Sequence, residues 1–152
     1  MRIVIQRVLH ASVEVGGETV GKIGEGLLIL LGVADGDTAE DMKYLADKVA
    51  GLRIFRDEND KMNLSVRDID GEVLVVSQFT LCGDCRKGRR PNFDAAAKPD
   101  FAEKMYGEFL AYMGTLVRKV EHGIFGAAMK VDLLNNGPVT FVIDGKKERQ
   151  GD

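Results

Sequence analysis

An apolar run near the middle of the chain ends in polar side chains. Residues 74–82 read LVVSQFTLC, so Ser77, Gln78 and Thr80 interrupt a segment that otherwise has the composition of a buried strand. Buried hydroxyl and amide groups cost free energy unless they form hydrogen bonds, and a polar end to a core strand can therefore mark a site. A nucleophilic hydroxyl at Ser77 or Thr80 would need an adjacent base, usually a histidine held by a carboxylate.

The sequence offers no recognisable base for such a hydroxyl. His10 lies in the first predicted β segment and His122 lies just past the second predicted helix, and neither stands in a Ser-His-Asp pattern. A catalytic triad of side chains is therefore not predicted. If the chain is an enzyme, its chemistry must use backbone dipoles, bound water or groups of the substrate, which favours an easy reaction such as hydrolysis of an activated ester.

Cys82 and Cys85 form a C-x-x-C spacing directly after this strand. The spacing occurs in thiol–disulfide sites and in halves of zinc sites. A structural zinc needs four ligands, however, and the chain has no second C-x-x-C. The residues after Cys85 are also a poor start for a helix, which the thioredoxin-type motif requires. Two incidental thiols in a loop are the favoured interpretation, and a thiol redox protein is kept as an alternative.

The loop that follows is basic. Between residues 84 and 98 five basic and two acidic residues give a local charge of +3, in a chain whose net charge is −3. Phosphate contacts by Arg and Lys supply most sequence-independent affinity for nucleic acids. One interpretation is therefore a binding module for an RNA end or for DNA, and the other is a solvated charged run. The basic residues are Arg86, Lys87, Arg89, Arg90 and Lys98.

The elements that position these residues follow from the hydrophobic pattern. Apolar alternation and turn residues predict strands over residues 1–15, 18–24, 26–34, 52–57 and 71–81 and two strands within 128–144. Thr38 and Asp41 resemble a capping box that begins a helix, and Pro99 begins a second helix. Its expected buried stripe consists of Phe101, Met105, Phe109, Tyr112 and Leu116. This order predicts an α+β fold with a mainly antiparallel sheet or barrel and two main helices.

Length and composition predict one domain over residues 1–145, followed by a mobile tail at 146–152. The chain has 152 residues, of which 45% are hydrophobic and 30% charged, as in ordinary globular proteins. The longest apolar run is too short to cross a bilayer, and the first residues do not form a signal peptide. A cytoplasmic protein without membrane contact is expected.

Residues 135–140, NNGPVT, contain a Gly-Pro pair between two apolar segments. A turn that leads into a strand explains this composition, because Pro is common at the first residue of a strand. An X-Pro bond can also be cis, which is uncommon and usually purposeful. The sequence leaves the isomer of Gly137-Pro138 open.

These segments together resemble one family, the D-aminoacyl-tRNA deacylases, once called D-tyrosyl-tRNA deacylases. The resemblance extends to about Asp144 and rests on MRIVIQRV at 1–8, SQFTL at 77–81, KGRRPNF at 87–93, FGAAM at 125–129 and NNGPVT at 135–140. It implies a compact β-rich domain that forms a homodimer. The implied reaction is hydrolysis of the ester between a D-amino acid and the terminal adenosine of tRNA. Glycine mischarged onto tRNA(Ala) is also accepted, and no cofactor or metal is needed.

The resemblance also assigns roles to residues of this chain. Gly137 and Pro138 are implied to form a cis pair that reaches into the active site of the partner subunit and excludes L side chains, with Arg7 fixing its orientation. The segment Ser77, Gln78, Phe79 and Thr80 is implied to line the same pocket. Thr80 corresponds to a residue once proposed as nucleophile, and the family is thought to use main-chain atoms and the 2′-OH of the tRNA.

The remaining implied contacts concern the tRNA end. Phe125, Gly126, Ala127 and Met129 are implied to hold the terminal adenine. The basic loop then gains a role, because Arg86, Lys87, Arg89 and Arg90 can contact tRNA phosphates. Cys82 and Cys85 do not belong to the family pattern. The alternatives are a non-catalytic module that binds RNA ends or DNA and a thiol redox protein.

Overall fold

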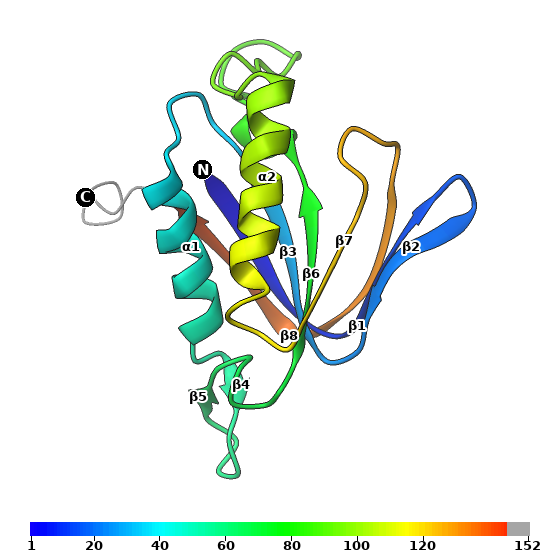
Figure 1. The fold of residues 1–152 in the computed structure, drawn as a ribbon, viewed down its shortest axis with the longest axis vertical. Helices are drawn as coiled ribbons and strands as arrows, with labels where there is room; N and C mark the ends of the chain where they lie inside the picture. Colours follow the sequence, from blue (N-terminus) through cyan, green and yellow to red (C-terminus); the bar gives the residue numbers. More distant parts are fainter. Residues whose placement is uncertain (146–152) are drawn as a thin grey trace.

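The computed structural model describes residues 1–145 (Figure 1), so the tail predicted at 146–152 lies outside the described residues. One face of a curved sheet is covered by two helices that lie side by side. The helices are α1 (Ala39–Gly51) and α2 (Pro99–Met113). The sheet strands are β1 (Arg2–Val15), β2 (Glu18–Ile23), β3 (Gly26–Gly32), β6 (Glu72–Ser77), β7 (Lys119–His122) and β8 (Lys130–Asp144).

The strand order is β2-β1-β3-β6-β7, and β8 pairs with β1. β1 pairs antiparallel with β2, β3 and β8, whereas β6 runs parallel to both β3 and β7. The sheet nearly closes into a barrel, since a Cβ atom added to Gly21 of β2 would lie 2.6 Å from the carbonyl oxygen of His122 in β7. The α+β class and the mostly antiparallel, barrel-like sheet are as predicted.

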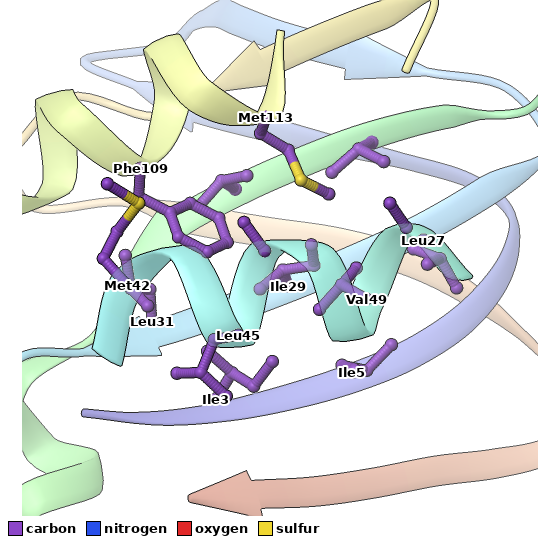
Figure 2. Close-up of a cluster of buried hydrophobic side chains, with 14 of the residues drawn as sticks. Ile3, Ile5, Leu27, Ile29, Leu31, Met42, Leu45, Val49, Phe109 and Met113 are labelled. Atoms are coloured by element: carbon purple, nitrogen blue, oxygen red, sulfur yellow. The ribbon is translucent and has the colours of Figure 1, made fainter. Parts of the chain in front are cut away.

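β3 and β6 are buried on both faces, which explains their continuous apolar sequences. On the helix side, Leu45 and Val49 of α1 and Phe109 of α2 pack against the sheet (Figure 2). On the opposite face, a second cluster includes Leu28 and Leu74. The strand that carries the polar end is therefore fixed from both sides.

Local signals explain where α1 and α2 begin. The hydroxyl of Thr38 accepts a hydrogen bond from the Asp41 amide, and the Asp41 carboxylate accepts one from the Thr38 amide, which forms the predicted capping box. Pro99 occupies the first turn of α2. Within residues 1–145, neither helix is long and apolar enough to cross a membrane.

Several details of the sequence prediction are wrong. The strand expected over 71–81 ends at Ser77, and Leu116 lies beyond the end of α2. The strand expected over 52–57 is reduced to β4 (Phe55–Arg56), which pairs with β5 (Met62–Leu64). β7 was not predicted. Phe101 is 39% exposed because it falls on the outer side of α2. Residues 130–144 form one continuous strand, β8, which stays paired with β1 across an irregularity at NNGP.

Candidate active site

The end of β6 is a sharp change of backbone direction. The strand ends at Ser77, and the 3₁₀ helix η1 (Phe79–Cys82) begins immediately after Gln78. The Gln78 amide donates a hydrogen bond to the Leu31 carbonyl at 2.8 Å, which anchors the bend to β3. Gly32 lies beneath this bend, because a Cβ atom there would be 2.9 Å from Leu81 Cβ and 3.0 Å from the Gln78 carbonyl oxygen. The polar end of the strand is thus a defined turn.

The side chains of this turn are engaged with each other and with solvent. Ser77 and Gln78 are half-buried, while Phe79 and Thr80 are exposed. The side-chain amide of Gln78 donates a hydrogen bond from Nε2 to the Thr80 hydroxyl. Within the described residues neither histidine is hydrogen-bonded to Ser77 or Thr80: His10 is exposed on β1, and Nδ1 of His122 lies 2.6 Å from the Gly123 carbonyl oxygen. The arrangement does not support a triad built on Ser77 or Thr80.

A hollow of about 590 Å³ opens beside the turn. Its size is within the range of pockets for small ligands. Within the described part of the chain, its lining contains no Asp, Glu, His, Lys or Arg. The lining residues are Val33, Val76, Ser77, Gln78, Phe79, Phe93, Ala96, Ala97, Pro99, Ala102, Phe125, Gly126, Ala127, Met129 and Val131.

One wall of the hollow is the segment between β7 and β8. Phe125, Gly126, Ala127 and Met129 all line the hollow, so the structure brings them together with Ser77, Gln78 and Phe79. The Phe125 ring packs against Tyr106 of α2, with ring centroids 6.1 Å apart.

Tyr106 ties this wall to β6. Its hydroxyl donates a hydrogen bond to the Val75 carbonyl at 2.9 Å. Burial raises the pKa of Tyr106 to about 12, so the hydroxyl keeps its proton and the link persists at neutral pH.

The opposite wall is formed by the basic loop and the start of α2. Asp84 and Asn92 exchange two backbone hydrogen bonds of 2.7 and 2.9 Å, which close a small hairpin over residues 84–92. Phe93 follows this hairpin and packs edge-on against Phe79. The sequence prediction missed Phe93 and Ala102 as lining residues, because only the docking of the loop and of α2 brings them to the end of β6.

Charges on the hairpin are not equivalent. Arg86 forms an ion pair with Asp84 at 2.7 Å, and hydrogen bonds from Arg86 lower the pKa of Asp84 to about 2. Lys87, Arg89 and Arg90 are exposed, and none of them makes an ion pair with another residue of the described chain. Three basic groups are therefore free to bind an anionic ligand, whereas Arg86 is already neutralised by its neighbour.

Gly137 and Pro138 lie outside the hollow, on β8. Their peptide bond is cis, both residues are exposed, and neither lines the hollow of its own chain. The pair projects from the irregularity of β8, where the register jumps between the pairs Gln6–Thr140 and Val8–Asn135.

Arg7 and Asn135 hold this projection in place. Arg7 is 1% exposed; its Nε donates to the Asn136 carbonyl at 2.8 Å and its Nη1 to the Ile54 carbonyl at 2.7 Å. Burial lowers the pKa of Arg7. The Asn135 side chain donates to the carbonyls of Arg7 and Val139 and accepts from the Val139 amide. A Cβ atom on Gly137 would collide with the Val139 backbone, so even alanine would disturb this turn.

The two cysteines are both free thiols. Cys82 is half-buried, its thiol lies 3.5 Å from the Val33 carbonyl oxygen, and burial raises its pKa. A raised pKa disfavours the thiolate that redox chemistry needs. No cluster of three metal-ligating side chains occurs among residues 1–145.

Comparisons with known proteins agree on one family. The sequence profile of the family described as D-Tyr-tRNA(Tyr) deacylase matches residues 4–144. A D-aminoacyl-tRNA deacylase of Thermosipho africanus is 61% identical over 147 residues, which cover 97% of this chain and 99% of the relative. A protein of the same name from Halothermothrix orenii is 56% identical over 148 residues, with 97% and 99% of the two chains covered.

Two solved structures are similar to the whole described fold. One is titled c-Myc DNA Unwinding Element Binding Protein; it is 41% identical and superposes with a TM-score of 0.91, covering 95% of this chain and 98% of that chain. The other is titled as a probable eukaryotic D-amino acid tRNA deacylase; it is 19% identical, with a TM-score of 0.78 and coverage of 94% and 98%. At that identity the second match shows the fold alone.

Proposed function

Because this chain belongs to the D-Tyr-tRNA(Tyr) deacylase family, we propose that it hydrolyses the ester bond of D-aminoacyl-tRNA and releases the D-amino acid and the tRNA. The observation that carries this proposal is the hollow at the end of β6. It has the volume for a terminal nucleoside, and its mostly apolar lining contains no ionisable side chain of the described residues. Its size and polarity suit a nucleoside, which carries no charge, better than a highly charged metabolite.

The wall at residues 125–129 is the place proposed for the terminal adenine. An aromatic ring and a thioether, from Phe125 and Met129, can pack against the two faces of a purine. Gly126 leaves room at the same wall because it has no side chain, and its φ of +77° is a conformation that glycine adopts easily. With the base held there, the ribose and its 3′-ester would face Ser77, Gln78 and Phe79.

The chemistry proposed at this edge uses main-chain atoms. The first amides of a helix lack intrahelical acceptors, so the N–H groups that open η1 can stabilise the oxyanion that forms when water attacks the ester carbonyl. Collapse of that intermediate breaks the bond to the 3′-oxygen, which takes up the proton that the attacking water gives up. The neighbouring 2′-OH of the tRNA activates the ester, so an ionisable side chain is not required.

Selection against L-aminoacyl-tRNA is proposed to come from a second copy of the chain. Gly137 and Pro138 are exposed and held by Arg7 and Asn135, yet they do not reach their own hollow. In a homodimer they could enter the partner's hollow and occupy the space of an L side chain, while a D side chain would point elsewhere. Glycyl-tRNA would be accepted because glycine has no side chain.

The dimer is proposed to form through β8, which carries the pair, and its neighbour β1. β1 and β8 expose several large apolar side chains, which is typical of an interaction surface. These residues are Leu9, Val131, Leu134, Phe141 and Val142. A cytoplasmic location, where aminoacyl-tRNA is made and used, is part of the same proposal.

The test is hydrolysis of D-Tyr-tRNA, L-Tyr-tRNA and Gly-tRNA(Ala) with chelator and reductant present. We expect release from the D and glycyl esters and none from the L ester. Equal rates for D and L esters would contradict the stereochemical proposal. Hydrolysis that stops on addition of chelator or reductant would contradict the main-chain chemistry.

A second candidate is nucleic-acid binding without turnover. The free basic groups Lys87, Arg89 and Arg90 favour it, as does the likeness to a protein titled as a DNA-unwinding-element binder. Strong, salt-dependent binding of tRNA with no release of any amino acid would support this candidate over the deacylase.

A further inference from the structure

Two exposed phenylalanine rings stand together at the mouth of the hollow. Phe79 is 54% exposed and Phe93 is 37% exposed, and both line the hollow. Their centroids are 5.1 Å apart and their planes meet at 63°, an edge-to-face contact. A paired exposure of large aromatic rings beside a pocket is more informative than a single exposed apolar residue.

Both rings are positioned before any ligand binds. Phe79 opens η1 at the bend that Gly32 permits. Phe93 directly follows the closed hairpin, and its ring lies against Gly83, where an added Cβ atom would be 3.0 Å from Phe93 Cε1. Because little conformational freedom remains to be lost, a ligand that stacks on these rings would pay a small ordering cost.

Phe93, which lines the hollow, also directly follows the hairpin that carries the free positive charges. Phe93 ends the segment whose hairpin carries Lys87, Arg89 and Arg90. A nucleic-acid strand with its last nucleoside in the hollow and its phosphates at the hairpin would have Phe93 beside it, since this residue joins the two places. Stacking on aromatic side chains tolerates any base, because every base has a π face.

We infer that Phe93, supported edge-on by Phe79, is the stacking surface for the base of the penultimate nucleotide of the bound strand. This inference rests on the proposed function in so far as the ligand is a polynucleotide 3′ end. It adds a second base-binding position to the one proposed at residues 125–129. The position is expected to contribute affinity and to align the strand, with little preference for the identity of the base.

The experiment compares two dinucleotides that differ only in the penultimate base. The probes are CpA and its analogue with an abasic ribose in place of cytidine, so both carry the same phosphate and the same terminal adenosine. Their dissociation constants are measured with the wild type, Phe93→Leu and Phe93→Tyr. Leucine keeps an apolar wall without a π face, and tyrosine keeps the π face, which makes it the matched control.

We expect the wild type and Phe93→Tyr to bind CpA about tenfold more tightly than the abasic analogue, the lower part of the range for base–aromatic stacking. Phe93→Leu should bind both probes with nearly equal affinity. A probe with 2-aminopurine as the penultimate base should lose fluorescence on binding the wild type and should keep it with Phe93→Leu, since stacking quenches this base.

Two outcomes would overturn the inference. The first is equal affinity of the wild type for CpA and the abasic analogue. The second is an unchanged difference between the probes in Phe93→Leu, which would make Phe93 a wall of the hollow only. Hydrolysis of D-Tyr-tRNA by the wild type is measured in parallel, so that loss of the stacking position and failure of the proposed function are separate results.

Discussion

At the scale of single residues, the candidate site depends on backbone geometry more than on reactive side chains. Thr80 resembles a nucleophile only in sequence, because its hydroxyl accepts from the Gln78 side chain and the residue does not line the hollow. Gly32 carries no functional group, yet its missing side chain allows the bend that aims the start of η1 at the hollow. The sequence identified Thr80 as a candidate site residue and gave no indication of Gly32.

Replacing Thr80 with alanine should leave most of the deacylase activity in place. The substitution removes a hydroxyl and one hydrogen bond, while the main-chain amides of η1 remain where they are. The check is the single-turnover rate on D-Tyr-tRNA, for which we expect a decrease of less than about tenfold. A loss of several orders of magnitude, with fold and tRNA affinity intact, would instead support a hydroxyl nucleophile.

Replacing Gly32 with alanine should impair catalysis without unfolding the chain. The new methyl group would lie 2.9 Å from Leu81 Cβ and 3.0 Å from the Gln78 carbonyl oxygen, so η1 must shift. Misplacement of reacting groups by about 1 Å can cost about 100-fold in rate. Gly107→Ala is the control, because nothing lies within 4 Å of its added Cβ atom. Wild-type kcat in Gly32→Ala would refute this role.

At the scale of elements, local sequence signals predicted what local interactions determine. The capping box at Thr38 and the Pro99 helix start both form as expected, because each depends on a few neighbouring residues. The three assignments that failed at the site depend on distant partners.

β7 is a four-residue strand without a strong apolar pattern, and it exists because the edge of β6 supplies its hydrogen-bonding partner. The NNGP segment has the composition of a turn, yet β1 pairs with β8 on both sides of it. The sequence after Ser77 continues like a strand, but Gly32 of the adjacent strand β3 leaves space for the backbone to turn away.

The basic residues of the hairpin at 84–92 are expected to contribute unequally to tRNA binding. Replacing Lys87, Arg89 and Arg90 together with glutamine should reduce the slope of log affinity for tRNA against log salt by about two units, the value for three contacts to a single strand. Arg86→Gln should change the slope little, since Arg86 is already bonded to Asp84. A decrease of this slope per residue that is as large for Arg86→Gln as for the triple substitution would contradict this assignment.

At the scale of the whole molecule, the sheet and its two helices form the support on which the site is built. β6 is buried on both faces, so the position of its polar end is set by the core and not by the loop that follows. The stability of the sheet and the position of the residues that line the hollow are therefore linked.

Glu72 at the start of β6 should stabilise the sheet in a pH-dependent way. A hydrogen bond from the Gly24 amide, followed by the charges of Lys119 and Arg118, lowers its pKa below 4.5 in the folded state. When folding lowers the pKa of a carboxyl group, its charge stabilises the folded chain at pH values above its pKa in the unfolded chain. This stabilisation is lost as the pH falls through its pKa in the folded chain.

Glu72→Gln should therefore reduce the free energy of unfolding at pH 7 by about 1 kcal/mol. Urea unfolding of both proteins at several pH values is the measurement. The difference between them should shrink as the pH falls below 4.5. A difference that stays constant with pH would show that the charge of Glu72 does not stabilise the fold.

The most direct measurement for the whole account is hydrolysis of D-Tyr-tRNA and L-Tyr-tRNA by the wild type, Ala102→Leu and Ala111→Leu. Ala102 lines the hollow from α2, whereas Ala111 is exposed on the same helix. We predict that the wild type and Ala111→Leu cleave the D ester and spare the L ester, and that Ala102→Leu folds but loses activity because the larger side chain projects into the hollow. Wild-type activity in Ala102→Leu, or equal cleavage of both esters by the wild type, would contradict the account.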